Sequence, residues 1–205
     1  MRCPSRQPNS WGPPSESDAI SIDDLSPLIR LNSLRCIDIA HVYPIKVTDA
    51  ELVAFAGALP QLEALILNEC PSIRDVAPTL TIDCLPALAQ VLPRLEILGL
   101  FFDASNEAAY KPASHTFQRL KLARLNRSPV NHGQCRDIAL YLSTVLTDGT
   151  ELDMTIKHIR FDVLTMPCPS CRHWKEIDRY FSVIMESRRW TREARAMLSL
   201  HSLTM

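Results

Sequence analysis

Leucine and other apolar residues recur along this chain in two alternating patterns, one typical of helices and one typical of short strands. From Thr48 to Leu67 the sequence TDAELVAFAGALPQLEALIL joins an apolar helical run to the pattern Leu-x-x-Leu-x-Leu. The same combination returns from Asp83 to Leu100 as DCLPALAQVLPRLEILGL. In both copies Leu-Pro-x-Leu-Glu links the two parts, so the chain contains an internal repeat of a helix and a strand.

The strand pattern occurs at five places and predicts five parallel strands. Counted from the residue that opens each pattern, the first four are separated by 28, 33 and 22 residues, which brackets the roughly 20–29-residue period of a leucine-rich solenoid. The predicted strands are Leu34-x-x-Ile37-x-Ile39, residues 64–68, residues 97–101, Phe117-x-x-Leu120-x-Leu122 and Leu152-x-Met154-x-Ile156.

Helix start and stop signals lie between these strands. Thr48 and Glu51 have the spacing of a capping box, and Pro60 ends the helix that follows. Asp83 is the predicted cap of a second helix that ends before Pro93. A third helix over 132–146 has a box-like start at 131–134. Each helix is expected to cover the back of the strand layer.

The C-terminal region leaves the repeat pattern. Trp174, Ile177, Phe181 and Ile184 follow each other at helical spacing, which predicts an amphipathic helix that caps the exposed end of the array. A short final helix is predicted around Trp190. The expected organisation is a Pro/Ser-rich disordered tail over 1–24, a repeat domain over 25–163, and a cap and tail over 164–205.

Alternation along each strand predicts which side chains face away from the core. Together these outward side chains form one open, concave surface, which is the candidate partner-binding site. Its predicted members are Cys36, Asp38, Ala64, Ile66, Asn68, Ile97, Gly99, Phe101, Arg119, Lys121 and Asp153.

Composition indicates an intracellular globular protein. Apolar residues make up 46% of the chain, charged residues 22%, and the formal net charge is −1, so no global attraction to nucleic acid or to an acidic membrane is expected. The N-terminus lacks the apolar core of a secretory signal, and no apolar run is long enough to cross a bilayer. The cysteines are scattered and odd in number, which predicts reduced thiols in the cytosol or nucleus.

Few residues suggest chemistry. The chain has neither a nucleophile elbow nor a phosphate-binding glycine loop, so we predict a non-enzymatic protein that needs no cofactor. Cys168, Cys171 and His173 have the spacing of half a zinc site, and a small zinc-binding protein is the alternative from another class. The basic residues near Arg119 do not alternate with aromatic residues, which disfavours nucleic-acid binding.

Several segments together resemble the leucine-rich-repeat half of fungal F-box-like proteins. They are the Leu-Pro-x-Leu-Glu repeats, the signature that ends in Cys70-x-x-Ile73, the strand end Gly99-Leu100-Phe101-Phe102-Asp103-Ala104, and Arg127-Ser128-Pro129-Val130. The resemblance covers about residues 25–187. It gives Cys70 a structural place in the turn after the strand. It also implies a substrate receptor of a ubiquitin ligase.

In that family a separate F-box helix bundle binds the cullin-ligase adaptor. Ahead of Leu25 we find no Leu-Pro-x-Glu-Ile-Leu segment of the F-box type. The expected fold is thus an α/β leucine-rich-repeat solenoid of four to five irregular repeats with a capping helix. The expected function is protein binding, either as a ligase receptor or as a free-standing scaffold.

Overall fold

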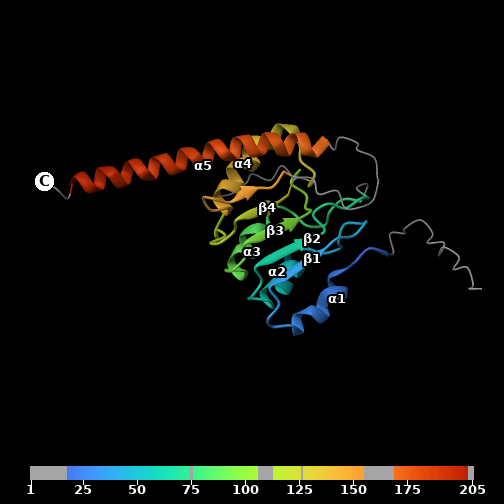
Figure 1. The fold of residues 1–205 in the computed structure, drawn as a ribbon. Helices are drawn as coiled ribbons and strands as arrows, with labels where there is room; N and C mark the ends of the chain where they lie inside the picture. Colours follow the sequence, from blue (N-terminus) through green and yellow to red (C-terminus); the bar gives the residue numbers. More distant parts are fainter. Residues whose placement is uncertain (1–17, 74–75, 106–112, 126, 155–168, 203–205) are drawn as a thin grey trace, which may run out of the picture.

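Five short strands form one all-parallel sheet in the computed structural model, which describes residues 18–73, 76–105, 113–125, 127–154 and 169–202 (Figure 1). The strand order is β1-β2-β3-β4-β5, so strands that follow each other in sequence are also neighbours in the sheet. The strands are β1 Cys36–Ile39, β2 Ala64–Leu67, β3 Ile97–Leu100, β4 Leu122–Arg124 and β5 Glu151–Leu152. This is a mixed α/β architecture.

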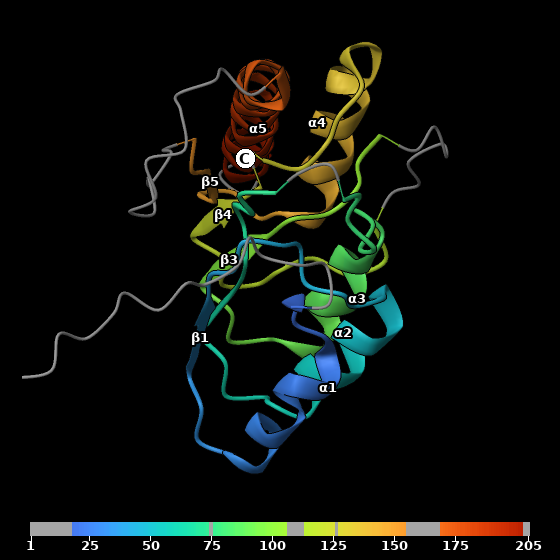
Figure 2. The ribbon, with the colours of Figure 1, turned by 90° about the vertical axis from the view of Figure 1, so that its right-hand side faces the viewer.

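Helices of the described ranges lie before β1, between most consecutive strands and after β5, and β4 follows β3 without a described helix between them. The helices are α1 Ile22–Leu25, η2 Ser26–Arg30, α2 Asp49–Gly57, α3 Cys84–Val91, η3 His132–Gln134, α4 Cys135–Val145 and α5 Pro169–Ser202, where η denotes a 3₁₀-helix. Figure 2 shows α2, α3 and α4 stacked on one side of the strands. Among the described residues, none of these helices is both long enough and apolar enough to cross a bilayer.

The core lies between this helix layer and the inward side chains of the sheet. Strand register aligns one inward residue from every strand, and each of them is at most 5% exposed. This inward row is Ile37, Leu65, Leu98, Ala123 and Leu152. Each strand buries its inward residue beside that of the neighbouring strand, so adjacent strands stabilise one another.

The predicted start of α2 is confirmed, and Asp83 and Asn131 also stand at the predicted N-cap positions, but neither makes a side-chain cap bond. Thr48 Oγ1 accepts from Glu51 N–H at 3.3 Å, and Glu51 Oε2 accepts from Thr48 N–H at 2.8 Å. Asp83 makes no side-chain cap bond, because its own backbone is already helical. Asn131 makes none either; its side-chain amide donates to the carbonyl of Ser105 at 2.9 Å.

The fourth strand has a different register from the predicted one. Its pattern is Leu120-x-x-Ala123-x-Leu125, three residues later than the pattern that opens with Phe117. Ala123 is the inward residue and is fully buried, while Leu122 points outward. A small inward alanine made the true pattern harder to recognise than the more apolar false one. Since three is odd, the shift exchanges the two faces of the strand.

The fifth strand begins where it was predicted and is shorter in the described part of the chain. Leu152 is buried in the inward row, and Asp153 N–H donates to the carbonyl of Ala123 at 2.9 Å. Thr155 and Ile156, which belonged to the predicted strand, lie outside the described residues.

The predicted amphipathic helix is present as the first part of α5, which packs against α4 and lies beside β5. Trp174 is fully buried; its ring meets Phe102 edge to face at 6.3 Å, and its indole N–H donates to the carbonyl of Ser128 at 2.8 Å. The predicted separate final helix is wrong, because α5 is one helix through to Ser202 (Figure 1). No glycine or proline interrupts the sequence after its first residue.

Residues 18–24, which were assigned to the tail, pack onto the first coil. Ser21 and Asp24 form a capping box in front of α1, and the carbonyl of Ile20 accepts from Lys46 N–H at 2.8 Å. Leu25 is 7% exposed and belongs to the core. Residues 1–17 lie outside the described ranges.

Candidate binding face of the sheet

The side of the sheet opposite the helix layer carries the outward side chains of the strands, and we call it the open face. Strand register sorts these side chains into two rows that cross the sheet. The first row is Cys36, Ala64, Ile97, Leu122 and Glu151. The second row is Asp38, Ile66, Gly99 and Arg124, with Asp153 beside Arg124.

A row of charged side chains precedes the first strand residues and borders the open face. We call Arg35, Glu63, Glu96 and Lys121 the charged row. Main-chain hydrogen bonds connect these four positions in order across the sheet. Arg35 pairs with Glu63 at 3.5 Å, and Lys121 pairs with Glu96 at 2.7 Å. Because both pairs are largely exposed, they contribute little to stability and present mixed charge to solvent.

Lys121 acts on its neighbour as a hydrogen-bond donor. Its ammonium group lowers the pKa of Glu96, and the more distant Arg119 makes a smaller contribution. Arg119 itself is exposed but lies three residues before β4. The predicted place of Arg119 and Lys121 on outward strand positions is therefore wrong. Lys121 belongs to the charged row, and Arg124 holds the outward strand position.

The middle of the open face is covered more than predicted. Ala64 is 9% exposed and Ile66 is 7% exposed, while Gly99 is buried and Ile97 is half-buried. A Cβ atom on Gly99 would lie 2.9 Å from Ile66 Cγ2 and 2.5 Å from Glu69 Oε2. The side chains of Ile66 and Glu69 thus occupy the space over Gly99. Ala64, Ile66 and Gly99 are wrong as freely exposed contact residues.

An ion-pair cluster lies at the carboxyl end of the strands. Arg124 Nε is 3.0 Å from Asp153 Oδ2, and Arg124 Nη1 is 3.8 Å from Glu69 Oε1. The side chains of these three residues are only 13–22% exposed. Asp153 therefore faces outward as predicted and is held by Arg124. Removal of one member would leave a partly buried charge without its partner, so the cluster is primarily structural.

Asn68 is a structural residue and is wrong as a surface contact. Its φ of 48° lies in the left-handed region, which ends the strand alternation after Leu67. It is 2% exposed; its amide donates to the carbonyl of Tyr43, and its Oδ1 accepts from His41 N–H at 2.9 Å. Asn68 thereby joins two consecutive coils. Cys70, which was predicted for that turn, is half-exposed.

Phe101 is also wrong as a surface anchor, because it is 7% exposed. The chain leaves the sheet at this point. The next residue, Phe102, is fully buried, and its N–H donates to Ser128 Oγ at 3.1 Å. Of the predicted contact residues, Cys36, Asp38, Arg119 and Lys121 remain exposed.

Sequence reasoning missed the charged row and Arg124. A signal for the charged row was present, since the residue after the opening leucine of each pattern is charged: Leu34-Arg35, Leu62-Glu63, Leu95-Glu96 and Leu120-Lys121. Only the observed register of β4 aligns Lys121 with the other three members of the charged row. The same register change places Arg124 on the second outward row.

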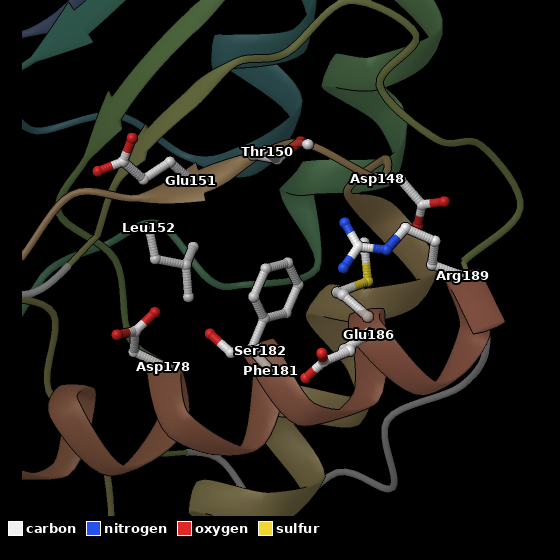
Figure 3. Close-up of a pocket in the computed structure, with 11 residues that line it drawn as sticks. Asp148, Thr150, Glu151, Leu152, Asp178, Phe181, Ser182, Glu186 and Arg189 are labelled. Atoms are coloured by element: carbon white, nitrogen blue, oxygen red, sulfur yellow. The ribbon is translucent and has the colours of Figure 1, made fainter.

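A cavity of about 460 Å³ lies between β5 and α5 (Figure 3). Leu152 and Phe181 form an apolar part of its lining, while Glu151, Asp178 and Arg189 add charges. Burial raises the pKa of Asp178, and the carboxylate of Glu151 raises it further. Because Glu151 also belongs to the open face, the cavity continues that face toward α5. Its lining suits a basic side chain with an aliphatic stem.

The zinc alternative cannot be placed on the described residues alone. Cys168 lies outside them, while Cys171 and His173 lie in the first turns of α5. The ring of His173 meets that of His132 at 5.3 Å. In the part of the chain that the structure describes, no three His, Cys, Asp or Glu side chains are arranged to hold a metal ion. The zinc site stays a prediction.

Comparisons of the chain with protein-family models, with curated proteins and with solved structures give no match. The fold and its surfaces are therefore the basis of the functional assignment.

Proposed function

We propose that this chain is a leucine-rich-repeat protein-interaction module that binds a partner protein on the open face of its sheet. The observation that carries the proposal is the consecutive order of five parallel strands, which turns one position of every repeat into a row across one surface. With the helices on the other side, this surface remains for a partner (Figure 2).

The repeat spacing supports a solenoid. With the observed register of β4, the opening leucines are Leu34, Leu62, Leu95 and Leu120, and their separations become 28, 33 and 25 residues. These separations are more even than the 28, 33 and 22 residues obtained when the fourth pattern opens at Phe117. The Asn68 side chain, which bonds the preceding coil, is the kind of contact that holds adjacent repeats in register.

The chemistry of the open face favours a partner with charges of both signs. Asp38 is exposed, the charged row combines two exposed basic side chains with two half-exposed carboxylates, and the cavity beside Glu151 adds a site for a basic side chain. Such a surface selects partners by charge complementarity and disfavours uniformly charged ligands. By resemblance, the partner is a protein recruited for ubiquitination. A scaffold without a ligase is the second candidate.

A charge exchange between the open face and the charged row that borders it tests the proposal. In the variant Asp38→Lys with Lys121→Glu, the net charge is unchanged and both residues are exposed. We expect at least about a tenfold loss in affinity for a partner that is captured by the natural protein, because attractive contacts become repulsive.

The matched control exchanges Arg136→Glu and Asp137→Lys on α4, outside the open face. We expect this variant to keep its affinity. Binding to purified partner is measured by titration calorimetry, and thermal unfolding checks that both variants are folded. Equal affinities for the two variants would refute the open face as the binding site.

Affinity purification from cells that naturally produce the protein separates the two forms of the proposal. Recovery of a cullin-ligase adaptor together with the partner would support the receptor function. Recovery of the same partner without an adaptor would favour the scaffold.

A further inference from the structure

The two ends of α5 present apolar side chains on opposite sides of the helix. In the first half, Trp174, Ile177 and Phe181 face the core and are buried. In the second half, the side toward the body is basic: Arg188 donates to the carbonyl of Ser143, and Arg192 pairs with Asp148. The apolar residues of this half therefore point away from the body. Figure 1 shows this half extending beyond the rest of the molecule.

The outward side chains of α5 follow one another in steps of three and four residues. We call this set the α5 seam: Tyr180, Val183, Ser187, Trp190, Ala194 and Met197. Steps of three and four are the spacing of a coiled-coil seam. Val183 is 67% exposed, Trp190 63% and Met197 63%. Such large apolar side chains are rarely exposed together on one stripe unless another helix covers them.

From Ser187 to Met197 small and large residues alternate along the α5 seam, so that this part of the seam is complementary to a second copy of itself. In an antiparallel coiled coil, the two kinds of seam position face each other across the interface. Trp190 then lies opposite Ala194 of the second copy, and Met197 lies opposite Ser187 of the second copy. A parallel pair would place Trp190 opposite Trp190 of the second copy, where the rings clash. It would also place Ala194 opposite Ala194 of the second copy, where a gap remains.

We propose that α5 pairs with α5 of a second copy of this chain in an antiparallel coiled coil, with the two-fold axis near residue 192. The same surface is used by both copies, as closed two-fold symmetry requires. The bodies lie on the outer sides of the pair, because each body contacts the opposite side of its own helix. The open face of each sheet is not part of this contact.

The seam is long enough for a weak, reversible dimer. With the axis near residue 192, residue 183 of one helix lies opposite residue 201 of the other, and this overlap is about 27 Å long at about 1.5 Å per residue. Few large side chains are exposed in this overlap, so the contact area is at or below the lower limit of roughly 1,200 Å² in total for specific interfaces. We therefore expect association in the micromolar range.

Sedimentation equilibrium of the full chain tests the proposal with two matched variants. Ala194→Glu places a carboxylate in the seam, opposite Trp190 of the second copy. Ala196→Glu places the same group two residues away, on another side of the same exposed helix. We expect a dimer for the natural protein, at least about a tenfold larger dissociation constant for Ala194→Glu, and a change below about threefold for Ala196→Glu.

Circular dichroism verifies that α5 stays helical in both variants. A natural protein that is monomeric at about 100 μM, or a dimer that Ala194→Glu does not weaken, would overturn the proposal.

Disulfide trapping tests the direction of the pair. Ser187→Cys and Met197→Cys chains are oxidised separately and after mixing, with the natural protein oxidised alongside as the reference for its own cysteines. The antiparallel pair predicts a 187–197 cross-link in the mixture, identified by peptide mass. A 187–187 cross-link in the single variant would contradict it.

Discussion

Gly99 shows how one residue determines the shape of the open face. Because it has no Cβ, the side chains of Ile66 and Glu69 can lie over the middle of the sheet. The apolar centre of the face is therefore closed by its own residues. A partner that binds as proposed would then contact the side chains around this centre, namely the exposed Asp38 and the partly exposed charged row.

Replacement of Gly99 by alanine is expected to destabilise the fold by roughly 1–3 kcal/mol, because the added Cβ would lie 2.9 Å from Ile66 and 2.5 Å from Glu69. Gly133→Ala is the control, since no heavy atom lies within 4 Å of its added Cβ. Urea denaturation of both variants measures the change. Equal urea midpoints for the two variants would contradict the conclusion that Ile66 and Glu69 cover Gly99.

Asp178 is expected to make stability depend on pH. Burial and then Glu151 raise its pKa in the folded protein. Because the pKa of Asp178 is higher in the folded than in the unfolded protein, Asp178 contributes favourably to the free energy of unfolding below the unfolded pKa of about 4. This contribution is lost as pH rises through the folded-state pKa.

Asp178→Asn should therefore stabilise the protein at pH 7 and leave it unchanged below about pH 3, where both states are protonated. Thermal unfolding at the two pH values measures this difference. The same gain at both values would show that the effect is not electrostatic.

At the scale of elements, hydrophobic periodicity predicted most of the helices and strands. It failed where a small inward residue or a positive φ angle interrupted the pattern. The strong patterns around Leu65 and Leu98 located two strands and the helices before them. The fourth strand was misplaced because Ala123 is a weak hydrophobic signal next to Phe117. Positive φ at Asn68 ended alternation one residue early, which sequence spacing alone does not reveal.

Side-chain exposure was harder to predict than strand position. Alternation states which way a residue points and does not state what lies over it. Ile66 points outward and is nevertheless buried. In contrast, the exposed stripe on α5 follows directly from helical spacing, once the helix is known to continue beyond Trp190.

Trp174 is expected to hold α5 against the last coils. Trp174→Ala should cost roughly 3–5 kcal/mol, because a fully buried ring and its contact with Phe102 are lost. Trp174→Phe keeps a six-membered ring and loses the N–H bond to the Ser128 carbonyl and part of the buried indole, so it should cost less. Hydrogen exchange of α5 amides distinguishes helix undocking from global unfolding. Equal costs for both variants would contradict the role of the ring.

At the scale of the whole molecule, the two proposed interaction surfaces lie on different parts of the fold. The open face belongs to the sheet, and the α5 seam belongs to the extended half of the terminal helix (Figure 1). A second copy on α5 and a partner on the sheet can therefore bind together. Dimerisation would double the number of open faces in one assembly and raise avidity for a repeated partner.

Labelling of the Cys36 thiol tests the open face most directly. Cys36 is an exposed cysteine on the first outward row, while Cys171 is half-exposed on α5. Maleimide labelling is followed for both, by peptide mass, with and without saturating partner. The account predicts that the partner slows labelling of Cys36 at least about tenfold and leaves Cys171 unchanged. Undiminished labelling of Cys36 in a fully formed complex would contradict it.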